Sequence, residues 1–237
     1  MKIALVSAQF INGDTKYNLS QMEHYLIEAK KQSAHLVCFG ESFLQGFDCF
    51  TWRFEDDKNI AISTNSSLFT EVCNMSLQHK IDILFGYMEI DGEAIYSSCA
   101  LISNGKLCHN YRRISKGWKE YTKTDEHYCE GDTVEVFDYN GRSCVLALCG
   151  DLWDYPERFA LGEDLLLWLC YVSWTADQWE NEQKNNYALQ AGKCCTHTLY
   201  VNSICQGDAL GGVVFFEKGL VKHELPMGNE GLLLVEL

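Results

Sequence analysis

Cys149 stands at a point in the sequence where a thiol can become reactive. The apolar run 145–148 predicts a buried strand, and Cys149-Gly150-Asp151 follows as a turn before a helix start. Backbone N–H groups and the positive end of a helix favour thiolate at such a place, and the same N–H groups can hold a developing oxyanion. An arbitrary strand cysteine is usually an inert core thiol, but the Cys-Gly-Asp turn ahead of Pro156 weakens that interpretation.

Glu41 comes directly after another predicted buried strand, residues 36–39, and is followed by more apolar residues. A carboxylate in such surroundings has poor access to water. Desolvation raises its pKa and suits it to carry protons. The ordinary alternative is a helix N-cap or a surface ion pair, and this segment taken alone favours that alternative.

A basic cluster follows a third predicted strand, residues 107–114. Arg112 and Arg113 lie at the end of this strand, and Lys116 and Lys119 come just after it. Such a cluster ordinarily lies on a solvated edge, so its position in the sequence does not identify a site.

Size and charge limit the classes of function. The chain has 237 residues, two prolines and no Pro-, Ser- or Gly-rich linker, so a single domain over residues 1–237 is expected. Its formal net charge of −14 disfavours nucleic acid and anionic membrane surfaces as partners.

The longest apolar run, residues 165–172, is too short to span a bilayer, which needs about 20 residues. The N-terminus is typical of a first strand rather than a secretion signal, which predicts a cytoplasmic protein.

The twelve cysteines are scattered from Cys38 to Cys205, mostly inside apolar segments. We interpret them as reduced, buried thiols that act as small apolar residues. Cys194, Cys195 and His197 are close together, but no second Cys or His pair completes a metal site, so no metal is expected. A metal or redox protein built on the cysteines is the alternative, and it predicts bound zinc or a disulfide.

Apolar periodicity predicts helices and strands that alternate along the chain, with hairpins at Asn104-Gly105 and Asn140-Gly141. Stacked layers of helix and sheet are therefore expected. The predicted helices cover residues 18–32, 67–78 and 179–192. The predicted strands cover residues 2–10, 36–39, 81–87, 95–102, 107–114, 134–137, 143–148, 165–169, 199–204, 212–216 and 232–236.

Taken together, these segments resemble the nitrilase-like (carbon–nitrogen hydrolase) superfamily, in the correct order and over nearly the whole chain. The matching segments are KIALVSAQF for the first strand, LVCFGESFLQGF for the glutamate motif, NYRRISKGWKE for the lysine region, YCEGD before the next strand, LALCGDLWDYPERF for the cysteine motif, and GGVVFFEKGLV with GNEGLLLVEL for the last strands. The resemblance implies a four-layer α-β-β-α sandwich that carries a Glu–Lys–Cys triad. Each motif alone is weak, but their common order along the chain is specific.

The resemblance also implies roles for individual residues. Glu41 would be the proton shuttle, Cys149 the nucleophile, and the Gly150 N–H a donor to the oxyanion. Glu120 stands seven residues after Arg113, where relatives often have an additional active-site glutamate.

The lysine of the triad does not carry over directly. The family usually has Tyr-Arg-Lys where this chain has Tyr-Arg-Arg, so a gapless match puts Arg113 in the lysine position. Arginine can supply positive charge but no transferable proton. We therefore predict that Lys116 completes the triad, with Lys119 and Arg113 as alternatives. This prediction requires the strand to end or bulge by Ser115, and Gly117 would permit that break.

The implied function is hydrolysis of a small amide, N-carbamoyl compound or nitrile through a thioester, without a metal or organic cofactor. Relatives pair near the cysteine motif, and residues 154–161 are rich in bulky side chains, so a homodimer is expected.

Trp153-Asp154 stand where the family commonly has a single arginine, so the sequence does not identify the substrate. The irregular lysine region supports one alternative, a catalytically inactive binding or scaffold protein of the same fold.

Overall fold

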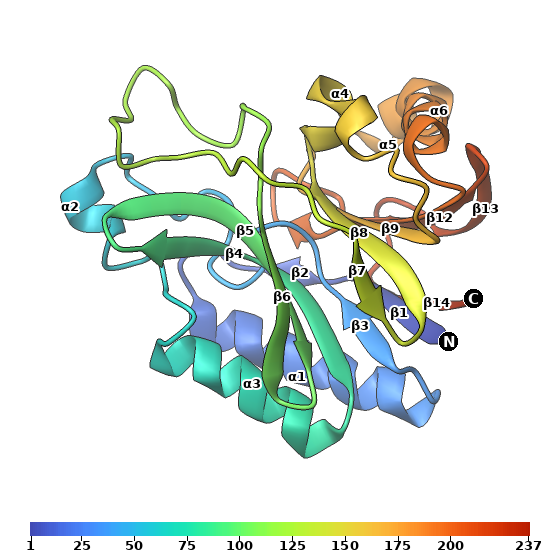
Figure 1. The fold of residues 1–237 in the computed structure, drawn as a ribbon, viewed down its shortest axis with the longest axis horizontal. Coiled ribbons are helices and arrows are strands. Elements are labelled where there is room, and N and C mark those ends of the chain that lie inside the picture. The colour runs from blue at the N-terminus through green and yellow to red at the C-terminus, as the bar shows by residue number, and fades with distance from the viewer.

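A computed structural model describes residues 1–237, and its strands form two six-stranded sheets and one two-stranded sheet (Figure 1). The strands of the first sheet are β1 (Lys2–Ser7), β3 (Leu36–Cys38), β4 (Asp82–Asp91), β5 (Ala94–Ser103), β6 (Lys106–Arg112) and β14 (Gly231–Glu236). Those of the second are β7 (Phe137–Tyr139), β8 (Arg142–Leu148), β9 (Leu165–Cys170), β10 (His197–Asn202), β12 (Val213–Glu217) and β13 (Leu220–Leu225). The strand orders are β14-β1-β3-β4-β5-β6 and β13-β12-β10-β9-β8-β7, with parallel and antiparallel pairs in each.

Helices cover the outer face of each sheet. Figure 1 shows α1 (Thr15–Lys31) and α3 (Ser67–His79) on one side of the molecule, and α4 (Asp151–Asp154) and α6 (Lys184–Cys194) on the other. The largest core cluster has 38 buried residues and draws them from both sheets. The predicted four-layer α-β-β-α sandwich is therefore confirmed.

Helix α1 illustrates how the sequence forms these layers. Leu19, Met22, Leu26 and Ala29 are buried at three- and four-residue spacings, which gives the helix one apolar face against the sheet. The side chain of Asp14 accepts a hydrogen bond from the Tyr17 N–H at 2.9 Å and so caps the first turn. The helix consequently starts three residues before the predicted start at residue 18.

Other elements differ from the prediction in detail. The first predicted strand is split at Ala8, and β2 (Gln9–Phe10) pairs with β11 (Ile204–Cys205) instead. The predicted helix 179–192 is preceded by α5 (Ala176–Gln178) and begins with a π-helical turn, η2 (Trp179–Gln183), before α6. The short helix α2 (Phe54–Asp57), the 3-10 turn η1 (Pro156–Arg158) and strand β13 were not predicted. Strand β13 lies at a sheet edge and is largely exposed, so it lacks the apolar pattern that marks a buried strand.

The candidate site residues lie at neighbouring strand ends of the two six-stranded sheets. Glu41 follows β3, Cys149 follows β8, and Cys170 ends β9, which is parallel to β8. The Glu41 N–H donates to the Cys170 carbonyl at 3.2 Å and so links the end of one sheet to the end of the other. No helix is both long and apolar enough to cross a membrane.

Candidate active site

Glu41 is completely buried beside a cation and a hydroxyl. Its Oε1 accepts hydrogen bonds from Arg113 Nη1 and from Ser97 Oγ, each at 2.9 Å. Its Oε2 is buried as well but has no hydrogen-bond partner within the protein. Because a buried carboxylate oxygen without a partner is costly, it marks a position where a proton or a donor from a ligand can be bound.

Arg113 is the cation of this site. Strand β6 ends at Arg112, and the Arg113 side chain, only 3% exposed, turns inward. Besides its bond to Glu41, the guanidinium donates from Nε to Ser115 Oγ at 2.8 Å and from Nη2 to the Lys116 carbonyl at 3.0 Å. Each guanidinium nitrogen thus has an acceptor, which fixes the plane of the group.

Burial and charge oppose each other in this group of residues. Desolvation raises the pKa of Glu41 above its ordinary value, although the Arg113 charge and the Ser97 hydrogen bond partly oppose the shift. Burial alone would lower the pKa of Arg113, but the nearby charges of Glu41 and Cys149 raise that pKa above its usual value. The arginine therefore stays protonated, and Glu41 is the group whose proton can move.

Cys149 has a strained backbone at the end of β8. Its φ is +35°, a region that residues other than glycine rarely adopt. Its N–H donates to the Leu169 carbonyl at 2.9 Å, and its carbonyl accepts from Trp168 Nε1 at 2.9 Å. The partly exposed thiol lies 3.6 Å from the Tyr171 carbonyl. Two backbone-directed hydrogen bonds thus hold this conformation.

Gly150 brings the arginine close to the residue after the cysteine. A Cβ at this position would lie 2.7 Å from Arg113 Nη2 and 3.0 Å from Ser115 Oγ. Only a residue without a side chain allows the guanidinium to pack there. The cation therefore lies against the turn that carries Cys149.

Asp151 ties the arginine segment to the cysteine turn. Its Oδ1 accepts from the backbone N–H groups of Ile114 and Ser115, at 3.1 and 2.8 Å. Its Oδ2 accepts from the Leu148 N–H at 2.8 Å and the Tyr111 hydroxyl at 2.6 Å. One buried carboxylate thus fixes the ends of β6 and β8 relative to each other.

The three remaining predicted residues lie elsewhere. Lys116 is exposed, and its ammonium lies 5.9 Å from the centre of the Tyr121 ring. The prediction that the Lys116 ammonium turns inward is therefore corrected, because the Arg113 side chain lies beside Glu41 instead. As predicted, the strand ends before Ser115. In the turn that follows, the Lys116 carbonyl, not the Lys116 ammonium, contacts the Arg113 guanidinium. Lys119 is buried in an ion pair with Glu130 at 3.1 Å. Glu120 is exposed.

Sequence reasoning did not identify Ser97, Asp151 or Trp168 as site residues. Asp151 belongs to the Cys-Gly-Asp turn, so its position was a usable signal. Ser97 and Trp168 lie in the strands β5 and β9 and have no local signal. Their contacts with Glu41 and Cys149 arise only from strand pairing.

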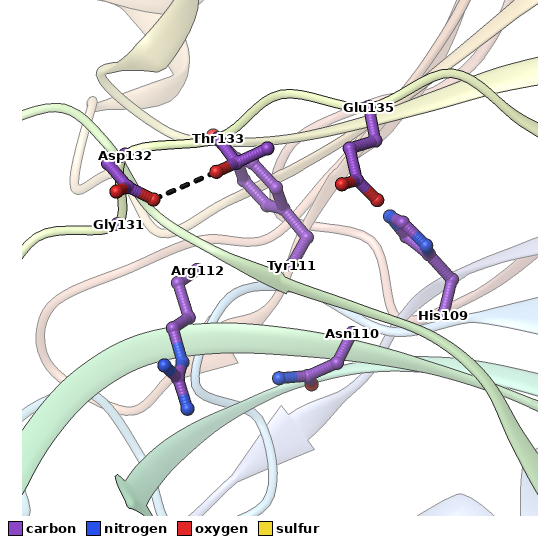
Figure 2. Close-up of a pocket in the computed structure, with 8 residues that line it drawn as sticks. All are labelled: His109, Asn110, Tyr111, Arg112, Gly131, Asp132, Thr133 and Glu135. Carbon is purple, nitrogen blue, oxygen red and sulfur yellow. Dashed lines mark hydrogen bonds between the residues drawn. The ribbon is translucent and has the colours of Figure 1, made fainter.

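A surface pocket of about 250 Å³ lies along β6 and the loop after it (Figure 2). Figure 2 shows the Glu135 carboxylate facing the His109 ring and the Thr133 hydroxyl donating to Asp132, a bond of 2.8 Å. Arg112, on the same wall, is paired with Glu89 at 2.7 Å. Neither Glu41 nor Cys149 lines this pocket, which is therefore separate from the candidate active site.

Comparison with known proteins assigns the fold to a family. The family model described as carbon–nitrogen hydrolase matches residues 2–209, so the chain belongs to the carbon–nitrogen hydrolase (nitrilase) family. A solved structure of a mutant of the amidase from Nesterenkonia sp. AN1, with acrylamide added to its active-site cysteine, superimposes with a TM-score of 0.80 at 19% identity. The superposition covers 100% of this chain and 93% of the amidase, and at that identity it shows the likeness of fold.

Curated relatives match over shorter stretches. An arylacetonitrilase from Aspergillus niger is 29% identical over 105 residues, which are 41% of this chain and 31% of the relative. A nitrilase from Pyrococcus abyssi is 28% identical over 163 residues, which are 66% of this chain and 58% of the relative. The match thus spans about a third of the arylacetonitrilase and less than two thirds of the nitrilase.

Proposed function

We propose that this chain is a cysteine-dependent hydrolase of carbon–nitrogen bonds in small amides, N-carbamoyl compounds or nitriles. Cys149 would be the nucleophile, Glu41 the proton carrier and Arg113 the cation. The observation that carries the proposal is the buried Glu41–Arg113 pair next to the strained Cys149 turn, with Glu41 Oε2 free of partners. A purely structural ion pair has no need of a free carboxylate oxygen.

Acylation would begin with proton transfer from the Cys149 thiol to Glu41. The sulfur then attacks the amide or nitrile carbon and forms a carbon–sulfur bond. Negative charge grows on the amide oxygen or nitrile nitrogen, where the Arg113 charge and the Gly150 N–H would stabilise it. Each well-placed donor of this kind lowers the barrier by roughly 3 kcal/mol. With an amide or N-carbamoyl compound, Glu41 returns the proton to the leaving nitrogen, which departs as ammonia or an amine as the thioester forms. With a nitrile, the protonated nitrogen stays bound as a thioimidate, and one water must add to its carbon before ammonia leaves and the thioester forms.

Hydrolysis of the thioester would use the same residues in reverse. Glu41 takes a proton from water, the hydroxide attacks the acyl carbon, and the Cys149 sulfur leaves and is reprotonated. Arg113 cannot give up a proton at physiological pH, so Glu41 must be the donor or acceptor in every proton transfer. The raised pKa of Glu41 suits this double role, because a proton carrier works best when its pKa lies near the working pH.

A panel of candidate substrates tests the proposal directly. Short aliphatic amides, ω-amides of dicarboxylic acids, N-carbamoyl amino acids and nitriles would each be assayed for release of ammonia. The matched control is Cys149→Ala, which removes the sulfur and keeps the fold. Turnover that persists in this variant would rule out Cys149 as the nucleophile.

One observation favours the alternative, a binding or scaffold protein without turnover. Every guanidinium nitrogen of Arg113 already has a protein acceptor, whereas a catalytic cation must also contact the reacting atoms. Alkylation distinguishes the two proposals. A nucleophilic Cys149 should react with iodoacetamide first among the twelve thiols near neutral pH, whereas an inert one should not.

A further inference from the structure

Cys149 and Cys170 are neighbours across two parallel strands. The register of β8 and β9 pairs Ala147 with Trp168 and Leu148 with Leu169, and the residues that follow this last pair are Cys149 and Cys170. The hydrogen bond from the Cys149 N–H to the Leu169 carbonyl, at 2.9 Å, continues the ladder to this point. Paired strands lie about 4.8 Å apart, so residues that directly follow a ladder pair start close to the Cα separation of about 4.4–6.8 Å that a disulfide needs.

The two thiols differ in their access to solvent. Burial raises the pKa of Cys170 well above its usual value, and the neighbouring Cys149 adds to that shift. Cys170 is completely buried, whereas Cys149 is partly exposed. Only Cys149 can therefore meet a small molecule from solvent, and Cys170 is the buried thiol at the end of the neighbouring strand.

We propose that Cys149 and Cys170 form a reversible disulfide when the protein meets a peroxide, with Cys170 as the resolving thiol that protects Cys149 from irreversible oxidation. This function goes beyond hydrolysis and does not require it. It depends on the reactivity of Cys149 towards a peroxide and on the register of two strands.

The chemistry takes two steps. The Cys149 thiolate attacks one oxygen of hydrogen peroxide: a sulfur–oxygen bond forms, the oxygen–oxygen bond breaks, and hydroxide leaves. Cys149 is thereby oxidised by two electrons to a sulfenic acid, and the peroxide is reduced. The Cys170 sulfur then attacks the Cys149 sulfur: a disulfide bond forms, the sulfur–oxygen bond breaks, and the hydroxyl leaves with the Cys170 proton as water.

Peptide mapping can locate this bond in the wild-type protein. Trypsin releases residues 143–158, which contain Cys144 and Cys149, and residues 159–184, which contain Cys170 alone. After brief treatment with hydrogen peroxide, quenching in acid and alkylation, we expect these two peptides to be linked and to separate on reduction. The Cys144→Ala variant is the matched control, because Cys144 pairs in the ladder with Leu165 and not with a thiol. The link should survive in that variant and disappear in Cys149→Ala.

The resolving role is tested by over-oxidation. In Cys170→Ala, and in Cys170→Val as a second variant that keeps apolar volume in the core, peroxide should convert Cys149 to sulfinic and sulfonic acid, which dithiothreitol does not reverse. In the wild type, dithiothreitol should restore an alkylatable Cys149. A peroxide-treated wild type without the 143–158 to 159–184 link, or one that over-oxidises Cys149 as fast as both variants do, would overturn the proposal. Neither readout measures hydrolysis, so failure of the hydrolase proposal would be seen separately.

Discussion

Replacing Arg113 by methionine would remove the positive charge beside Glu41 and leave most of the side-chain volume. Glu41 is 0% exposed and Arg113 is 3% exposed, so the variant keeps a buried carboxylate without its counter-ion. Breaking a buried pair by removing one partner costs about 3–5 kcal/mol in the free energy of unfolding. Such a loss is a large part of the total stability of about 5–15 kcal/mol that is typical of folded proteins.

The size of this loss should depend on pH, with a sign that follows from the pKa of Glu41. That pKa is already raised by burial, and loss of the Arg113 charge, which lowers it, must raise it further. A carboxyl with a raised pKa in the folded state contributes stability while it is protonated, and this contribution is lost as pH rises through the folded-state pKa. The difference in unfolding free energy between wild type and Arg113→Met should therefore be small near pH 5 and larger at pH 8.

Urea unfolding at both pH values measures this difference. Lys116→Ala is the matched control, because it also removes one basic side chain, but an exposed one, and should change the unfolding free energy by no more than about 0.5 kcal/mol. Arg113→Lys should fall between the two, since one ammonium can replace the charge but not all three nitrogen contacts. An Arg113→Met variant as stable as Lys116→Ala at both pH values would refute the buried-pair reasoning.

Three further predictions concern the nucleophile, the proton carrier and the assembly. Cys149→Ala should abolish turnover in the ammonia assay while moving the melting temperature by less than about 3 °C; wild-type activity would contradict this. Ser97→Ala removes a hydrogen bond that lowers the pKa of Glu41, so the acid limb of the kcat/KM profile should move to higher pH, and an unmoved limb would exclude the contact from the reaction. The chain should form a homodimer whose interface is the surface around residues 154–161, where Leu161 is 48% exposed. Sedimentation as a 27.1 kDa monomer at micromolar concentration would contradict the dimer.

Local sequence patterns were sufficient to predict most of the fold, because the signals are short-range. The three-and-four spacing of buried residues in α1 predicted an amphipathic helix, and the apolar runs before Glu41 and Cys149 predicted buried strands. The same patterns failed at β13, an exposed edge strand, and at the start of α1, where the capping contact of Asp14 extends the helix. Periodicity reports burial, so it is weak wherever an element is exposed or is set by a cap.

The sequence by itself was sufficient to identify the family, and its motifs are the basis for proposing Glu41 and Cys149 as site residues. Which basic residue accompanies them was decided by the tertiary structure alone. Strand β6 ends at Arg112, and Asp151 binds the backbone N–H groups of the next turn, which directs Arg113 inward and leaves Lys116 exposed. Likewise, only the pairing of β8 with β9 brings Cys149 to the strand that ends at Cys170, where its N–H donates to the Leu169 carbonyl. These contacts join residues that are far apart in the chain, and no local pattern of residue types predicts which distant residues come into contact.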